Sequence, residues 1–411
     1  MQATEGDFER TQATERAVQH ALEAVKCLGW SVDLQQRGRD LKTTFAQLVL
    51  SDQRLCAGIG KGVGAQSKAS ALWEALEHAF SLCGTPPVLK ALPVDLARHD
   101  AALVGASPDL TRFPTGEVAI SRITFECLAD ASQTIDFPYF LCDPYFECAR
   151  DEERQILTAL GLRRYGTNSG TASGATWEEA ILHGLLEIVE RDAVGMALLQ
   201  SVIREPAKPV NKIVLGSLPD IAKELVSRVE QECSGTVEAW YLVNDVGVPV
   251  VLAAVSIRSG DQGSESRYFG SGASLSPTYA LERALLEAVQ YFHVHASRSE
   301  LKPKPRKNLV GGLPRFLGCF LEGGFFDYQG GERLIGLPGT DDRLQYLPPA
   351  AQVQQIVDFL GNIGVRVYSR TIVNSPVFVT QVVAPHLERF HLVARGVIVA
   401  PSLRGRRVLQ V

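Results

Sequence analysis

The sequence predicts an α/β (α+β) protein, and two observations carry this prediction. The chain has 411 residues, 45% hydrophobic and 21% charged, so it can bury a large core and is not intrinsically disordered. A glycine-rich segment followed by a helix with acidic residues also occurs three times, among short apolar segments typical of strands. We therefore expect the glycine-rich loops and the helix starts to converge on one bound anion.

The elements of the first half of the chain follow from apolar periodicity and turn residues. Residues 15–28 predict an amphipathic helix that ends at Gly29, and residues 41–50 predict strand. Residues 55–64 predict a strand that enters a glycine-rich loop around Lys61, and residues 67–78 predict the first acidic helix. Short strands are expected at 118–125 and 138–142.

The second half repeats the combination of glycine-rich loop and helix twice. The glycine- and serine-rich stretch 166–174 leads into a second acidic helix over 176–192. The third unit has strands at 238–243 and 249–257, a loop at 270–272 and a helix over 278–294. The C-terminal part predicts a helix at 353–360 and strands at 365–368, 377–383 and 392–400.

Length alone suggests two or three domains, but no stretch of the chain reads as a flexible linker, so one large domain with subdomains is equally allowed. We expect a single domain over residues 1–411. Within it, 1–54 is an N-terminal helix and strand segment, 55–298 holds the site motifs, and 299–411 is a C-terminal helix and strand segment.

The charge and the termini indicate where the protein acts. A formal net charge of -5 and a pI near 6.0 give no general attraction to nucleic acid or to anionic membranes. Residues 1–19 lack the apolar core of a secretory signal, and the apolar stretch 246–257 is too short to span a bilayer. The eight cysteines have no zinc-site spacing. We expect a cytoplasmic protein without nucleic-acid or membrane partners.

Both acidic helices carry glutamates on one face. Glu74 and Glu77 are about 60° apart, and Glu179, Glu187 and Glu190 lie within about 80° on the second helix. Residues 69–89 and 165–190 contain no lysine or arginine, whereas a solvated helix face usually has them interspersed. The pattern is therefore consistent with a metal-nucleotide site or with a plain acidic surface.

Two further features favour the nucleotide site without deciding it. Arg283, Glu287 and Gln290 share one stripe of the third helix, where the arginine can bind phosphate or pair with Glu287. Lys61 lies among four glycines, but the loop is not a Walker A motif because Gly62 follows the lysine.

At these residues the chain resembles the YcaO family of ATP-dependent enzymes that activate peptide backbone amides. The resemblance extends over about residues 55–298. It rests on Gly60-Lys61-Gly62, Ser70 with Glu74 and Glu77, Asn168-Ser169-Gly170 through Gly174, Glu179-Ala180, Glu187, Glu190-Arg191-Asp192, Gly270-Ser271-Gly272, and Arg283 with Glu287 and Gln290.

The resemblance implies a YcaO-type fold with mixed and antiparallel sheets, whose helices converge on an ATP site, with ATP and Mg2+ as cofactors. It implies Mg2+ ligation by Glu74, Glu77, Glu187 and Glu190. It implies nucleotide or phosphate contacts from Lys61, Ser70, Asn168, Glu179, Arg191, Arg283 and Gln290.

The resemblance also implies a function. The chain is similar to the stand-alone cyclodehydratase subunits of thiazole/oxazole-modified, microcin-type peptide synthetases in bacteriocin biosynthesis. Such a subunit phosphorylates a backbone amide oxygen of a ribosomally synthesised precursor peptide while Cys, Ser or Thr forms an azoline. Two alternatives stay open: thioamide or amidine formation by the same chemistry, and a non-catalytic scaffold of the same fold.

The partners implied by the resemblance are a precursor peptide, an E1-like or leader-binding protein, and a flavin dehydrogenase of a synthetase complex; a homodimer is a further candidate. Residues 302–307 are basic and form either a docking loop or a solvated turn. Azoline-forming members commonly end in a Pro-x-Pro-x-Pro tail, whereas residues 401–411 contain the single proline Pro401.

Overall fold

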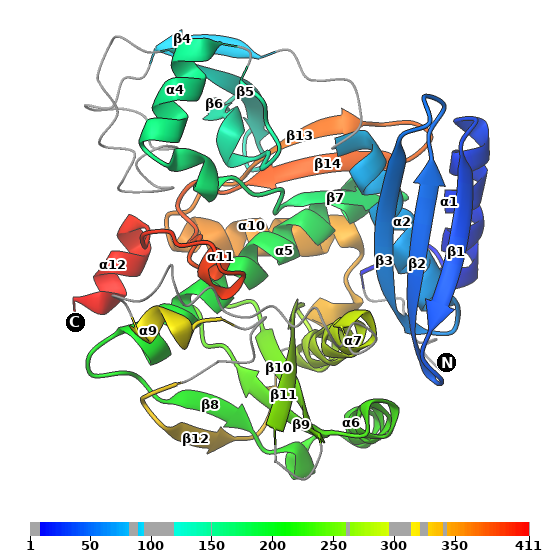
Figure 1. Ribbon diagram of the computed structural model, residues 1–411, viewed down its shortest axis with the longest axis vertical. Helices are drawn as coiled ribbons and strands as arrows, with labels where there is room; N and C mark the ends of the chain where they lie inside the picture. The colour runs from blue at the N-terminus through cyan, green and yellow to red at the C-terminus, as the bar shows by residue number, and fades with distance from the viewer. Residues whose placement is uncertain are drawn as a thin grey trace.

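Three sheets and the helices that cover them make up the fold of the computed structural model (Figure 1). The structure describes residues 9–81, 89–93, 119–148, 150–259, 264–295, 314–320, 328–339 and 343–410. The basic segment 302–307 therefore lies outside the described residues. The expected α+β class with mixed and antiparallel sheets is confirmed, because one sheet contains a parallel pair and the other strands pair antiparallel. The division into domains stays a prediction.

The first sheet is antiparallel in the order β1-β2-β3 and is covered by two helices. Helix α1 packs on α2, and α2 packs directly on β3 and β2. The bounds are α1 Thr14–Cys27, β1 Ser31–Arg37, β2 Leu41–Val49, β3 Leu55–Val63 and α2 Ala65–Ser81. The apolar face of α2 (Leu72, Ala75, Leu76 and Ala79) is buried in this layer, as its periodicity predicts.

The second sheet has six strands and joins distant parts of the chain. Its order is β4-β5-β13-β14-β7, with β6 beside β5. Helix α5 lies along β14 and β7 and also contacts α10. The bounds are β4 Lys90–Pro93, β5 Ala119–Cys127, β6 Thr134–Pro138, β7 Thr171–Gly174, α4 Asp151–Ala159, α5 Trp177–Leu198, α10 Pro349–Asn362, β13 Tyr368–Val373 and β14 Phe378–Val383.

The third sheet has the order β11-β10-β9-β8-β12, in which only the β8–β12 pair is parallel. Helix α7 covers β11 and β10, and α6 packs against α7. The bounds are β8 Val210–Ile213, α6 Asp220–Cys233, β9 Thr236–Tyr241, β10 Val250–Ser259, β11 Ser264–Ala273, α7 Pro277–His295 and β12 Glu332–Ile335. Three short helices elsewhere in the chain are α9 Pro314–Leu317, α11 His391–Ala394 and α12 Leu403–Leu409. Figure 1 shows α2, α5 and α7 facing the middle of the molecule, each from a different sheet.

Three sequence-based strands are wrong. Residues 392–400 contain the short helix α11, which packs on α5, and no strand. The segment around 138–142 is a 3-10 helix at Tyr139–Leu141, and the strand expected at 365–368 begins only at Tyr368. These segments are short apolar runs without a clear period, and such runs do not distinguish a buried strand from a buried helical turn.

The glycine-rich loops are also wrong, because most of these glycines lie within strands. Strand β3 continues to Val63 and β11 to Ala273, so the glycines around Lys61 and Ser271 are strand residues. A Cβ atom on Gly60 would lie 2.1 Å from the Ala71 nitrogen, and one on Gly272 would lie 2.4 Å from the Ala280 oxygen. The glycines therefore let α2 and α7 approach their strands closely. They do not form loops that enclose a phosphate.

We expect Gly60→Ala to lower the free energy of unfolding by about 1–3 kcal/mol, because the added methyl group meets the backbone of α2, which cannot move as a flexible side chain can. Denaturant unfolding measures the effect. Gly361→Ala in α10 is the matched control: its new methyl group has no neighbour within 4 Å, so unchanged or higher stability is expected. Equal stability of Gly60→Ala and wild type would contradict the close approach.

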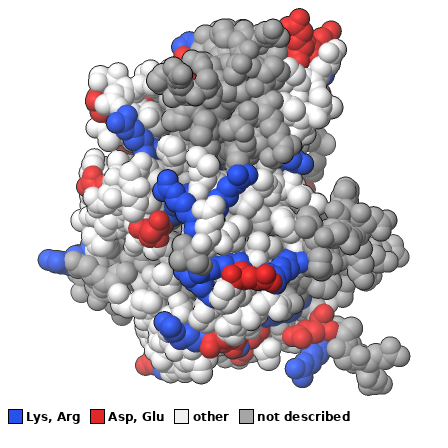
Figure 2. All heavy atoms as spheres, turned by 90° about the vertical axis from the view of Figure 1, so that its left-hand side faces the viewer, with Lys and Arg blue, Asp and Glu red and all other residues white. Residues whose placement is uncertain are grey.

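Figure 2 shows the side of the molecule on which the C-terminal helix α12 lies, with lysine and arginine side chains gathered across its middle. Arg406 and Arg407 of α12 are both exposed. In the part of the chain that the structure describes, no helix is both long and apolar enough to cross a membrane.

Candidate functional site

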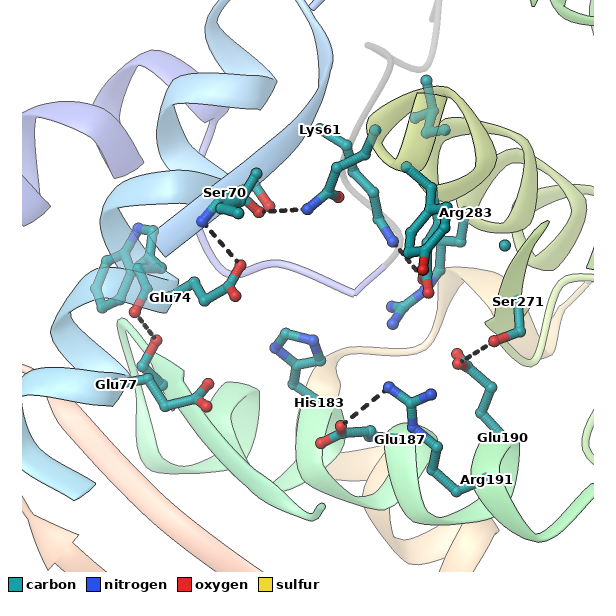
Figure 3. Close-up of a pocket in the computed structure, with 18 of the residues that line it drawn as sticks. Lys61, Ser70, Glu74, Glu77, His183, Glu187, Glu190, Arg191, Ser271 and Arg283 are labelled. Carbon is teal, nitrogen blue, oxygen red and sulfur yellow. Dashed lines mark hydrogen bonds and ion pairs between the residues drawn. The ribbon is translucent and has the colours of Figure 1, made fainter. Parts of the chain in front are cut away.

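A cavity of about 710 Å³ opens between α2, α5 and α7 (Figure 3). Its volume falls in the range of small-molecule and cofactor sites. Every residue that the sequence analysis assigned to ATP or Mg2+ lines it: Lys61, Ser70, Glu74, Glu77, Asn168, Glu179, Glu187, Glu190, Arg191, Arg283 and Gln290. Residues more than 200 positions apart therefore meet at one site.

Helix α2 contributes two carboxylates. In Figure 3 Glu74 and Glu77 point from α2 across the cavity towards α5. The backbone N–H of Ile59 donates to Glu74 at 3.3 Å, whereas the Glu77 side chain makes no hydrogen bond or ion pair among the described residues. Burial, together with the charges of Glu187 and Glu74, holds the pKa of Glu77 well above its ordinary value. Among the described residues neither carboxylate forms an ion pair, although the charges of His78 and Lys61 act on Glu74.

Helix α5 contributes the opposite wall. The N–H of Gly170 donates to Glu187 at 3.0 Å, and Arg191 lies 3.7 Å from the other oxygen of the same carboxylate. Burial is the main cause of the raised pKa of Glu187. The Ser271 hydroxyl of β11 donates to Glu190 at 2.7 Å, which fixes this carboxylate against the third sheet.

The carboxylates fit a divalent metal ion that is only partly coordinated by protein. Among the described residues, no group of three or more His, Cys, Asp or Glu side chains is in position to hold a metal ion. Yet burial raises the pKa values of Glu74, Glu77 and Glu187, so a nearby cation would relieve an electrostatic cost. Mg2+ is usually bound through one or two carboxylates together with phosphate oxygens and water. The set therefore suits Mg2+ that arrives with a nucleotide.

Positive side chains are concentrated towards α7. Lys61 of β3 donates to Glu287 at 2.6 Å, and Arg283 donates to Glu9 at 2.8 Å. Burial opposes the charge of Arg283, but the charges of Glu9, Glu190 and Glu287 together with Tyr279 outweigh it, and the pKa of Arg283 is raised. The cavity thus has an acidic part between α2 and α5 and a cationic part at α7 and β3, which suits a metal-polyphosphate.

The structure corrects the idea that the helix glutamates have no counter-charges. Arg10 pairs with Glu179 at 3.0 Å from 169 positions away, and Arg191 pairs with Glu187. The partner of Arg283 is Glu9 and not the Glu287 of its own helix. Gln290, assigned to the nucleotide, donates to the carbonyl of Ile59 at 2.9 Å and so ties α7 to β3.

Sequence reasoning missed several side chains of the cavity, among them two histidines and Arg10. His183 lies on the same face of α5 as Glu179 and Glu187, at a spacing of four residues from each, so this signal was present. Burial and nearby cations keep the pKa of His183 well below its usual value. His391 of α11 is a second neutral imidazole, because burial lowers its pKa, and Arg10 precedes the first helix. The sequence gives no signal for these last two.

A match to a protein-family profile identifies the family of this chain. The profile of the YcaO cyclodehydratases, described as ATP- and Mg2+-binding, matches residues 59–388. The chain belongs to the YcaO family. ATP and Mg2+ are therefore the cofactors of its family, as the sequence predicted.

Solved structures agree with the YcaO fold. A heterocyclase in complex with substrate and cofactor superimposes with a TM-score of 0.66 at 20% identity, over 94% of this chain and 54% of that one. A YcaO protein from Methanopyrus kandleri bound with AMPPCP and Mg2+ gives 0.64 at 18% identity, over 97% and 98% of the two chains. The E. coli microcin synthetase McbBCD complex gives 0.58 at 16% identity, over 87% and 88%.

Sequence relatives match a shorter part of this YcaO chain. An uncharacterized protein in the tfuA 3'region of Rhizobium leguminosarum bv. trifolii is 28% identical over 145 residues. An uncharacterized protein of Methanothermobacter thermautotrophicus is 34% identical over 143 residues. Each match covers 34% of this chain and about a third of the relative's own length (34% and 35%).

Proposed function

We propose that this chain is the ATP-using cyclodehydratase subunit of an azoline synthetase, which phosphorylates a backbone amide oxygen of a ribosomally made precursor peptide. One observation carries the proposal: all residues assigned to ATP and Mg2+ from sequence line a single cavity, with carboxylates at one end and cations at the other. The likeness of the fold to heterocyclases and to a microcin synthetase supports it.

The chemistry requires a good leaving group in place of an amide oxygen. A Cys, Ser or Thr side chain of the peptide adds to the preceding carbonyl carbon and closes the ring. The resulting oxyanion takes the terminal phosphoryl group of ATP, which releases ADP, and phosphate then leaves with the proton of the ring N–H to form the C=N bond of the azoline. When bound, Mg2+ neutralises charge on the phosphate oxygens during the transfer. The nucleophile comes from the peptide, so the protein's task is to bind, orient and balance charge.

Each group of side chains has a proposed part in this task. Glu74, Glu77, Glu187 and Glu190 would hold Mg2+, with Ser271 fixing the last of them. Lys61, Arg191 and Arg283 would contact the phosphates, and their present carboxylate partners hold them in place until the nucleotide binds. Ser70, Asn168, Glu179 and Gln290 would complete the nucleotide contacts.

Substrate capture in this proposal involves a leader-binding partner of the E1-like type, with a flavin dehydrogenase acting after ring closure, in a cytoplasmic complex. The exposed arginines of α12 provide one face on which an acidic partner segment would be complementary. The proposal also includes a homodimer of this chain as a candidate assembly.

Mass spectrometry of a candidate precursor peptide, incubated with the protein, its partner and Mg-ATP, tests the proposal. The loss of one water for each modified Cys, Ser or Thr is expected, with ADP and phosphate formed in equal amounts. Replacement of an amide oxygen by sulfur or by an amine nitrogen would instead assign the chain to thioamide or amidine formation. An unmodified peptide together with no ATP turnover would assign it as a scaffold.

A further inference from the structure

His391 is a buried imidazole of the cavity to which the proposed function assigns no task. It is the first residue of α11 and lines the cavity, although it is only 5% exposed. Its Nδ1 atom is inaccessible and has no hydrogen-bond partner among the described residues. Its Nε2 atom makes no hydrogen bond to the described part of the chain either, so Nε2 is the ring nitrogen that a molecule in the cavity can reach. A buried polar group without a partner in the chain needs an explanation, and a bound substrate provides one.

The backbone holds His391 firmly against α5. Helix α11 packs on α5, and a Cβ atom on Gly195 would lie only 3.0 Å from the His391 backbone nitrogen. The preceding residue is also fixed, because the Phe390 N–H donates to the buried Glu388 carboxylate at 3.0 Å. A side chain held in this way is positioned before the substrate arrives, as catalytic groups must be.

The surroundings of His391 keep its imidazole neutral. Burial lowers its pKa well below the usual value, and the charges of Arg191, Arg395 and Arg389 act in the same direction. A neutral imidazole can accept a proton at neutral pH. In the proposed function a phosphate chain binds at Arg191. Its negative charge would offset that arginine and so raise the basicity of His391 when ATP is present.

We propose that His391 is a catalytic residue, the general base that takes the proton of the peptide nucleophile. The inference deepens the proposed function and rests on it. As the Cys sulfur, or the Ser or Thr oxygen, bonds to the preceding carbonyl carbon, its S–H or O–H proton moves to Nε2. The electron pair of the C=O π bond moves to the carbonyl oxygen, which becomes the oxyanion. The imidazolium then releases its proton to water, which restores the neutral ring for the next turnover.

The competing explanation is that His391 only packs α11 on α5. Two versions of the candidate precursor peptide, with a single Cys or a single Ser at the modified position, distinguish the roles. A thiol has an ordinary pKa of about 8.5 and ionises partly without help, whereas a hydroxyl holds its proton far more tightly. In His391→Ala the single-turnover rate should fall about a hundredfold to ten-thousandfold with the Ser peptide and by a clearly smaller factor with the Cys peptide. The Kd for Mg-ATP should stay unchanged.

His386→Ala is the matched control, because His386 lies on the same segment but is exposed and does not line the cavity. It should modify both peptides like wild type. Circular dichroism verifies folding, and His391→Gln, which keeps a polar side chain, should show the same difference between the peptides if the alanine variant does not fold. An equal loss of rate with both peptides, or no loss, would overturn the inference but not the proposed function. A wild-type protein that turns over no ATP and modifies neither peptide would overturn both.

Discussion

Replacing Glu77 with glutamine is expected to abolish ATP turnover while making the Mg2+-free protein more stable. The Glu77 carboxylate has no hydrogen-bond or ion-pair partner among the described residues, and burial and the charges of Glu187 and Glu74 raise its pKa. A neutral amide of the same size removes that repulsion. If the carboxylate binds Mg2+, several kcal/mol of charge stabilisation depend on it, and turnover should fall about a thousandfold.

Unfolding experiments at several pH values provide an independent test of Glu77. Its pKa is raised above the ordinary 4.5, so the folded protein binds a proton that the unfolded chain has released. The free energy of unfolding of the wild type should therefore fall as the pH rises from about 4.5 towards the raised pKa, and Glu77→Gln should lack this component. Retained turnover in Glu77→Gln would remove the residue from the metal site.

Saturating Mg-ATP should stabilise the wild-type protein more than it stabilises Glu77→Gln. A ligand that binds only the folded state adds about 2.7 kcal/mol when its concentration is a hundred times Kd. The wild-type melting temperature should rise accordingly, whereas the gain should be reduced in Glu77→Gln. Glu15→Gln on the exposed side of α1 is the matched control and should behave as wild type in both measurements.

Long periodic elements were predictable from sequence, and short apolar ones were not. The helices expected at 15–28, 67–78, 176–192, 278–294 and 353–360 correspond to α1, α2, α5, α7 and α10. Their apolar stripes repeat over several turns, so local sequence determines them. The run at 392–400 has no such repeat. It forms α11 and not a strand because it packs on α5, a tertiary contact that its own residues do not encode.

The glycine-rich segments show how residues that line one cavity were grouped in part from incorrect geometry. Glycine indicates a turn in most sequences, yet here Gly60 and Gly272 are needed because helix backbone packs against strand backbone. Their recurrence still marks the three places where a strand and a helix meet the cavity. The place of the site was therefore predictable, whereas the mode of phosphate binding by loop amides was not.

The charge balance of the cavity depends on contacts that no local pattern predicts. Glu179 lies 169 positions from Arg10, and Lys61 lies 226 positions from Glu287. The absence of lysine and arginine from residues 69–89 and 165–190 was correctly observed, but cations still pair with the glutamates: Arg191 pairs with Glu187 within α5, and Arg10 reaches Glu179 from a distant segment. A sequence pattern can thus identify the carboxylates of such a site, whereas their partners depend on the tertiary fold.

Two substitutions on α5, Glu190→Gln and Asp192→Ala, should have different effects, the first on ATP turnover and the second on stability. Glu190 points into the cavity (Figure 3), whereas Asp192 does not line it and contacts Glu388 and Arg404 of the C-terminal segment. The fully buried Asp192 accepts a hydrogen bond from the Glu388 N–H at 2.7 Å and pairs with Arg404 of α12. Glu190→Gln should stop ATP turnover at nearly unchanged stability, because the amide can still accept from Ser271.

Asp192→Ala should instead lower the free energy of unfolding by about 3 kcal/mol, because it leaves Arg404 with the exposed Asp245 in place of its buried partner and leaves the Glu388 N–H without an acceptor. Denaturant unfolding measures this loss, and Arg404→Ala tests the pair from its other side. If the two residues act together, the double variant should cost less than the sum of the single ones. Additive effects, or an Asp192→Ala protein as stable as wild type, would show that the C-terminal segment is held by other contacts, such as those between Glu388 and Ser402.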